Sequence, residues 1–135
     1  MRLNTWLVLW SAILLSVTVG ACRSTVAPAP PANVFPVISS VVLFPWSIGA
    51  SDSAIMVCTA TDADGDTLVY DWVTDGRVRL KDARGGISVY GSRQNTQTFY
   101  CDTVRAPIDT SYIRCYVRDR RGGQDGRLVL LILRS

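Results

Sequence analysis

Apolar and polar residues alternate in short runs from Val37 to the C-terminus, and glycine and aspartate separate the runs. No stretch of this region keeps an apolar period of 3.6 residues over several turns, so the pattern predicts strands. Turn-forming sequences such as DADGD, TDG, RGG and RRGG lie between the runs. We expect strands at residues 37–44, 54–61, 67–73, 78–81, 87–90, 96–103, 111–119 and 127–133.

Seven or eight strands in residues 37–135 are typical of an all-β fold in which two sheets pack face to face. The number matches the immunoglobulin-like antiparallel β-sandwich, which has seven strands in ~100 residues. Because alternate side chains of a strand share one face, three of the strands offer an apolar face to such a core. We expect the inward sets to be Met56, Cys58 and Ala60; Leu68, Tyr70 and Trp72; and Ile113, Cys115 and Val117.

The N-terminal segment has a different pattern. Residues 6–19 are almost all apolar or small, and they follow a single positive charge, Arg2. A membrane-spanning helix needs ~20 apolar residues. The shorter stretch is typical of a secretory signal peptide, which is removed from the mature protein.

The residues that follow, Val19-Gly20-Ala21-Cys22, resemble the lipobox of bacterial lipoproteins. In that family a signal peptidase cuts before the cysteine, whose sulfur and new amino group are then acylated. The resemblance implies that residues 1–21 are a signal peptide and that Cys22 carries a lipid. Val19 departs from the family, where leucine is commoner at that position. The alternative is an ordinary secreted protein with a chance cysteine near the cleavage site.

Residues 22–36 connect this segment to the strands and contain prolines at positions 28, 30, 31 and 36. A stretch so rich in proline and so poor in side chains that pack is typical of an extended linker. We therefore expect three parts. They are a signal peptide at 1–21, a lipidated cysteine with a linker at 22–36, and a β-sandwich domain at 37–135.

Two runs within the domain, MVCTATDADGDTLVYDW at 56–72 and YIRCYVRDRRGG at 112–123, resemble bacterial PKD-like and cadherin-like modules of the immunoglobulin superfold. The resemblance implies that Cys58 and Cys115 lie across the core beside Trp72, as in immunoglobulin domains, and that they form a disulfide. Export would make oxidation available. Such modules serve as spacers, adhesins and binding units, so the fold by itself does not give a function.

Cysteine parity leaves one thiol over once Cys22 carries lipid, and Cys101 is the candidate. It is either a buried, inert thiol or a site for an intermolecular bridge or redox chemistry. A pairing of Cys101 with Cys115 is a further alternative.

The acidic turn, Asp62-Ala63-Asp64-Gly65-Asp66, is the segment with the most chemical character. Three carboxylates so close together need a counter-charge, and oxygen-rich clusters suit calcium. The expected topology places the turn after Asp119 at the same end of the sandwich, so Asp119 is a candidate fourth ligand beside Asp62, Asp64 and Asp66. The alternative is a structural turn whose charge is neutralised by arginines of the second turn, namely Arg118, Arg120 and Arg121.

Two aromatic features are candidates for contact with a partner. Tyr112, Arg114, Tyr116 and Arg118 alternate with core residues and should face outward, either as a binding surface or as a solvated face with cross-strand pairs such as Asp71 with Arg114. Trp46 is either a plug for the core or an exposed ring that stacks on sugars, and we expect the plug.

Composition narrows the functional classes. The net charge of +3 lacks the strong basic excess of nucleic-acid-binding proteins. The chain has neither histidine nor glutamate, so the commonest general base is absent and an enzyme is not expected.

Two hypotheses for function remain. The first is a membrane-anchored lipoprotein that presents an immunoglobulin-like domain for interaction with a protein or a glycan at the cell envelope. The second is a structural spacer lipoprotein without a ligand of its own. Arg23 follows Cys22, where many lipoproteins retained at the inner membrane have aspartate. We therefore expect the lipid anchor to hold the protein at the outer membrane.

Overall fold

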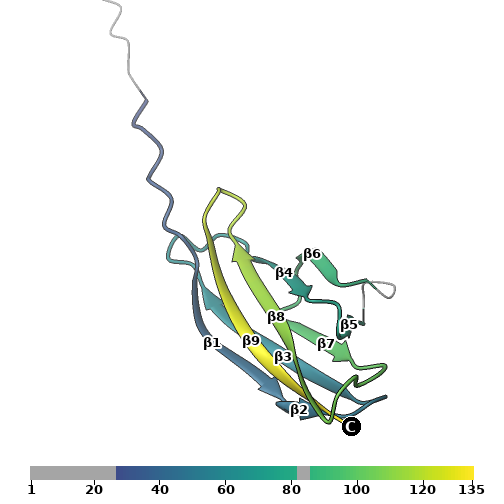
Figure 1. Ribbon diagram of the computed structural model, residues 1–135. Helices are drawn as coiled ribbons and strands as arrows, with labels where there is room; N and C mark the ends of the chain where they lie inside the picture. The colour runs from purple at the N-terminus through teal and green to yellow at the C-terminus, as the bar shows by residue number, and fades with distance from the viewer. Residues whose placement is uncertain (1–26, 82–85) are drawn as a thin grey trace, which may run out of the picture. The chain divides into compact units, whose positions relative to one another are not determined.

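The computed structural model describes residues 27–81 and 86–135, of which Pro31–Ser135 form one compact unit. The predicted signal peptide and Cys22 lie outside the described residues. The regular secondary structure of the described residues consists of β-strands (Figure 1). They are β1 (Val37–Phe44), β2 (Ser47–Ile48), β3 (Ser53–Thr61), β4 (Val69–Thr74), β5 (Arg79–Leu80), β6 (Ser88–Ser92), β7 (Thr96–Tyr100), β8 (Ile108–Arg118) and β9 (Gln124–Arg134).

These strands form two sheets that pack face to face. One has the order β1-β3-β7-β5 and the other the order β2-β9-β8-β4-β6. Figure 1 shows β8 and β9 as a long hairpin of the five-stranded sheet, with β3 behind them and β1 at the left. The all-β sandwich predicted from the sequence is confirmed.

The strand count and one pairing differ from the expectation. The described residues contain nine strands, because the prediction missed β2, which is too short at two residues for an alternation to be visible. The chain leaves the four-stranded sheet after Phe44 and joins the other sheet as β2, which pairs with β9 in parallel. The remaining pairs are antiparallel.

The core lies between the sheets and is built on Trp72, which is fully buried. Its ring stacks on Tyr70 at 6.2 Å and meets Phe99 of the facing sheet edge-on at 6.3 Å. Aromatic pairs in these geometries stabilise a core by ~0.5–1.5 kcal/mol beyond the area that they bury. The three inward sets expected from alternation point into this core, with Ala60 and Leu68 at its margin.

Candidate functional site

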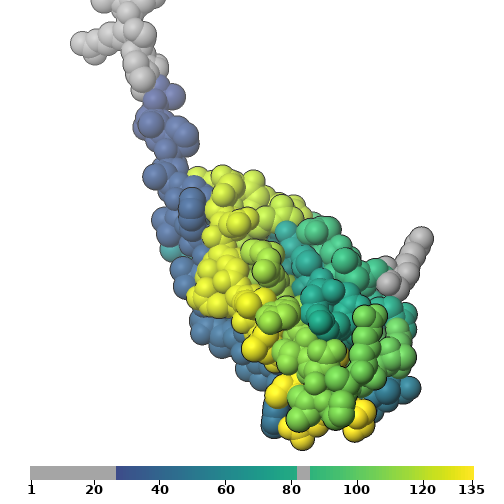
Figure 2. Space-filling view, viewed as in Figure 1, coloured from purple at the N-terminus to yellow at the C-terminus, as the bar shows by residue number. Residues whose placement is uncertain are grey.

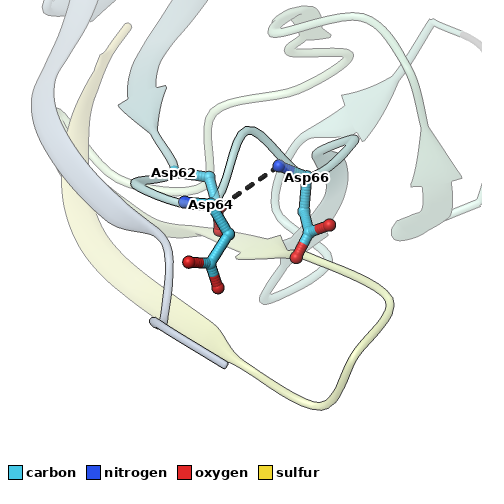
Figure 3. Close-up of side chains that lie close together, drawn as sticks. All are labelled: Asp62, Asp64 and Asp66. Carbon is cyan, nitrogen blue, oxygen red and sulfur yellow. Dashed lines mark hydrogen bonds between the residues drawn. The ribbon is translucent and has the colours of Figure 1, made fainter. Parts of the chain in front are cut away.

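The acidic turn follows β3 and is held by its own first residue. One carboxylate oxygen of Asp62 accepts hydrogen bonds from the backbone N–H groups of Asp64 at 2.9 Å and Asp66 at 3.2 Å. Figure 3 shows the three side chains on this single turn, with the bond from Asp66 drawn dashed. Gly65 has a φ of 74°, a left-handed conformation that glycine adopts without strain. Hydrogen bonds and a glycine within the turn itself therefore stabilise its conformation.

The counter-charge for the acidic turn comes from Arg121 on the hairpin between β8 and β9. Its Nη1 atom lies 3.4 Å from Asp64 Oδ2 and 3.1 Å from Asp66 Oδ2. This confirms that the two turns share one end of the sandwich. Of the three arginines expected there, Arg121 makes the contact, because Arg118 pairs with Asp71 instead.

The end of the proline-rich segment forms hydrogen bonds with the acidic turn and with Arg121. Val34 donates its backbone N–H to Asp64 Oδ2 at 2.8 Å, and Arg121 donates to the carbonyl of Pro31 at 3.1 Å. The linker was expected to reach Val37 before the domain began, but residues 31–36 belong to the compact unit. The acidic turn and Arg121 thus bind a segment of this chain.

Asp119, the candidate fourth ligand, is not among the carboxylates that the structure brings together at the acidic turn. Its side chain is buried and accepts hydrogen bonds from Asn33 Nδ2 at 2.6 Å and from the backbone N–H groups of Arg121 and Gly123 at 2.7 and 2.9 Å. Burial acts to raise the pKa of Asp119, but these hydrogen bonds outweigh it and hold the pKa below its ordinary value. Its oxygens are therefore already used to close the hairpin and to hold the linker.

A calcium site at the acidic turn stays a prediction. Asp62, Asp64 and Asp66 each offer an oxygen, and these oxygens lie within 4.8 Å of one another. Carboxylates so placed could hold a cation. Arg121 already faces two of them, so the contacts favour the structural alternative, in which the chain supplies its own positive charge.

The structure brings Cys58 and Cys115 together across the core and holds both as buried thiols. The interaction between the two side chains lowers the pKa of Cys58, and the same interaction together with burial raises the pKa of Cys115. The disulfide expected between them stays a prediction, and their placement is compatible with it.

Cys101 lies elsewhere in the core. Its backbone N–H donates to the carbonyl of Asp52 at 3.0 Å, at the opposite end of β3 from Cys58. Six residues of extended chain span ~20 Å, whereas the two Cα atoms of a disulfide lie within ~7 Å of each other. Cys115 lies beside Cys58 and is therefore also far from Cys101, which excludes the alternative pairing of Cys101 with Cys115. Burial raises the pKa of Cys101, which keeps its thiol protonated and suits the interpretation of a buried, inert residue.

The cross-strand pair expected between Asp71 and Arg114 is wrong. Asp71 instead pairs with Arg118 through two contacts, at 2.7 and 2.8 Å, and also accepts the N–H of Gly91 from β6 at 2.7 Å. Strand β6 covers Asp71, so a residue expected on a solvated face is buried. Arg118 is within reach of Asp71 because it lies on the same face of β8 as Tyr116, the residue that pairs with Asp71, two positions further along the strand.

Arg114 is left without an ion pair or side-chain hydrogen bond among the described residues. It lies on the outer face of β8 and β9, which Figure 2 shows in green and yellow. We call this surface the arginine–tyrosine face. Its members are Tyr112, Arg114, Tyr116, Leu128, Leu130 and Ile132.

Two shallow hollows flank Arg114 on this face. One, of about 270 Å³, is lined by Tyr112 and the end of β4, and the other, of about 310 Å³, by Tyr116 and Leu128. Tyr116 lies against Gly126, where a Cβ would come within 2.7 Å of its ring. The glycine therefore leaves room for the ring against the neighbouring strand, and Arg114 lies between Tyr112 and Tyr116 on the outer face of β8.

None of the members of the arginine–tyrosine face is acidic. Asp75, at the edge of one hollow, is already paired with Arg77 at 2.8 Å. The leucines opposite the β8 residues increase its apolar area, and Leu128 and Leu130 are about half exposed, at 52% and 51%. The tyrosines and Arg114 were expected to face outward from the alternation in their strand. These leucines were not expected there, because their outward direction depends on the register between β8 and β9.

Trp46 is not a core plug, contrary to the expectation. It is 57% exposed, and the guanidinium of Arg134 lies 5.3 Å from the centre of its ring. A cation–π contact of this kind at an exposed site is worth ~0.5–1 kcal/mol. Trp46 is exposed because it precedes β2, whose Ile48 fills the core position instead.

Comparisons with known proteins bear on the fold alone. No family model matches the chain, and the curated proteins give no match. A solved structure, described as a nucleoside hydrolase-related hypothetical protein from Saccharophagus degradans that is associated with carbohydrate metabolism, aligns with a TM-score of 0.51 and 17% identity. The alignment covers 76% of this chain but only 26% of that one. Such a likeness supports the sandwich architecture.

Within residues 27–81 and 86–135, no helical segment has the length and apolar character needed to cross a bilayer.

Proposed function

We propose that this chain is a lipid-anchored envelope protein whose β-sandwich binds an acidic protein partner through the arginine–tyrosine face. The anchor is supported by the apolar segment and the sequence around Cys22. The observation that carries the partner is Arg114, a guanidinium with no counter-ion in the described part of the chain, on an apolar and aromatic surface.

The composition of the face favours a protein over a glycan. Protein interfaces are enriched in tyrosine and arginine at their centres and depleted of lysine and acidic residues. Leu128, Leu130 and Ile132 add apolar area that a sugar, with its many hydroxyl groups, would leave poorly matched. A carboxylate of the partner would pair with Arg114, because a planar guanidinium suits bidentate contact with carboxylates.

Membrane attachment would make a modest affinity sufficient. A chain held at the membrane meets other envelope proteins at a high effective concentration, so a small contact is occupied without tight binding in solution. The shallow hollows beside Arg114 suit such a contact better than they suit an enclosed small molecule.

The anchor is tested by labelling the host cells with a fatty-acid probe. We expect the full chain to be labelled and Cys22→Ala to lose the label. Cys101→Ala is the matched control, because it removes a cysteine that lies buried in the domain. An unlabelled wild-type protein, or a labelled Cys22→Ala variant, would refute the anchor.

The partner contact is tested by photo-crosslinking in the host envelope, with a benzophenone amino acid in place of Leu130. We expect one crosslinked protein, which disappears when Arg114→Glu reverses the charge beside the probe. Arg93→Glu makes the same charge change on an exposed arginine outside the face and should keep the product. A product that survives Arg114→Glu would show that the face does not select its partner by charge.

A further inference from the structure

Three strands of the four-stranded sheet, β1, β3 and β7, are unusual in carrying no charge. Strands β1, β3 and β7, with the sequences VISSVVLF, SAIMVCTAT and TQTFY, contain no charged residue. On their outer face Val42 lies opposite Val57, and Phe44 lies opposite Ile55. We call these four residues the neutral patch. Phe44 is 74% exposed and Val42 59% exposed.

The surroundings of the neutral patch are polar but largely uncharged. Thr98 lies opposite Ile55, and Thr96 lies opposite Val57, on strand β7. Across the strands, the first charge appears beyond β7, where Arg79 of β5 pairs with Asp102. Along β3, the nearest charge is the exposed Asp52, which directly precedes the strand. An apolar centre with a polar rim is the arrangement that protein interfaces share.

Strand β1 also forms an edge of its sheet. Natural edge strands are commonly protected from pairing with other chains by charged residues, proline or bulges. Here a bulge lies near Ile38, at the end away from Phe44, and no charged residue follows within the strand. The part of β1 that carries Val42 and Phe44 therefore lacks that charged protection.

We propose that the neutral patch is a contact between two copies of this chain. A different partner with charged residues at the contact would bury them against a surface that offers no counter-ion, which is costly. The same patch on a second copy has no charge, and a two-fold axis would place Val42 and Phe44 against their counterparts. The arginine–tyrosine face could not pair with itself in this way, because its Arg114 side chains would repel each other.

The expected dimer is weak and reversible. Three strands spaced ~4.8 Å apart, with about five residues of ~3.4 Å each, present a flat area on the order of 250 Å². A stable interface buries about 800 Å² of accessible surface on each partner. The contact is therefore favoured where chains are concentrated, and it leaves the arginine–tyrosine face on the other sheet free for a different protein.

The test is photo-crosslinking of the full chain in its native membrane, with the benzophenone amino acid in place of Ile55. We expect a product of twice the chain's mass, in which peptide mapping finds this chain on both sides. Phe44→Lys should reduce its yield by about tenfold or more, because two buried positive charges would face each other. Co-expressing Phe44→Lys with Phe44→Asp should restore the product, since the charges then attract.

Two controls make the result decisive. Phe44 is highly exposed, so its variants should keep the near-ultraviolet circular dichroism of the fold. The probe in place of Leu130 lies on the other sheet and should give no product of twice the mass. Absence of the double-mass product at Ile55, its persistence with Phe44→Lys, or a crosslink only to a different protein or to lipid would overturn the proposal.

Discussion

Asn33 and Asp119, 86 residues apart in the chain, are joined by a hydrogen bond of 2.6 Å between the amide Nδ2 and a carboxylate oxygen. The bond ties the end of the proline-rich segment to the hairpin between β8 and β9. Beside it, Gly123 is buried against Phe35 and Pro36. The segment before β1 is therefore part of the folded unit down to Pro31.

We expect Gly123→Ala to destabilise the protein by about 1–3 kcal/mol, because an added Cβ would meet the carboxylate of Asp119 and lie 2.8 Å from the ring of Phe35. Urea unfolding followed by tryptophan fluorescence measures the change. Gln124→Ala, at the neighbouring exposed position, should stay within ~0.5 kcal/mol of wild type. Equal effects of the two variants would show that residues 31–36 do not pack on the hairpin.

The free energy of unfolding should fall in acid. Hydrogen bonds hold the pKa values of Asp75, Asp119 and Asp125 below their ordinary value in the folded chain. The stability that they contribute is therefore complete above the unfolded pKa of ~3.9 and is lost as the pH falls through the lower folded values. Urea midpoints measured from pH 6 to pH 2 should show this decline. Asp119→Asn should make it shallower, and an unchanged slope would contradict the assignment for Asp119.

Arg121 should determine whether the acidic turn responds to calcium. With Arg121 in place we expect added calcium or chelator to change the melting temperature little, since the arginine faces Asp64 and Asp66. Arg121→Ala leaves the carboxylates without that partner, so calcium should then raise the melting temperature. Arg120→Ala is the control, because its side chain makes no ion pair among the described residues. A large calcium effect on the wild-type protein would favour the metal site over the structural turn.

Reduction should lower the free energy of unfolding of protein isolated from an oxidising compartment, if Cys58 and Cys115 form a disulfide there. A disulfide that closes this loop would stabilise the fold by ~4 kcal/mol on the chain-entropy model. Dithiothreitol should therefore lower the urea midpoint of the wild type and of Cys101→Ser alike. An oxidised protein in which mass spectrometry finds both Cys58 and Cys115 as thiols would exclude the bridge.

Local patterns predicted most of the fold because strand alternation depends only on neighbouring residues. The inward directions of Met56, Trp72 and Cys115 followed from that period of two. Trp46 was placed wrongly because a single aromatic residue outside a strand has no period, and its exposure depends on where β2 joins the other sheet. The partner of Asp71 was also missed, since the choice between Arg114 and Arg118 depends on strand register and on the cover provided by β6.

The sequence by itself determined that the domain is an all-β sandwich, because the apolar period of a strand is a local property. It also identified two charged turns near one end of the sandwich, because the residues that form a turn are neighbours in the chain. Only the tertiary structure decided how those charges are used. It placed Arg121 against the acidic turn and Asp119 against Asn33, and it gave Arg114 no ion pair with any residue that the structure describes. It also set a charged face and a neutral patch on opposite sheets, because side chains distant in the chain share a surface only once strand order and register are fixed.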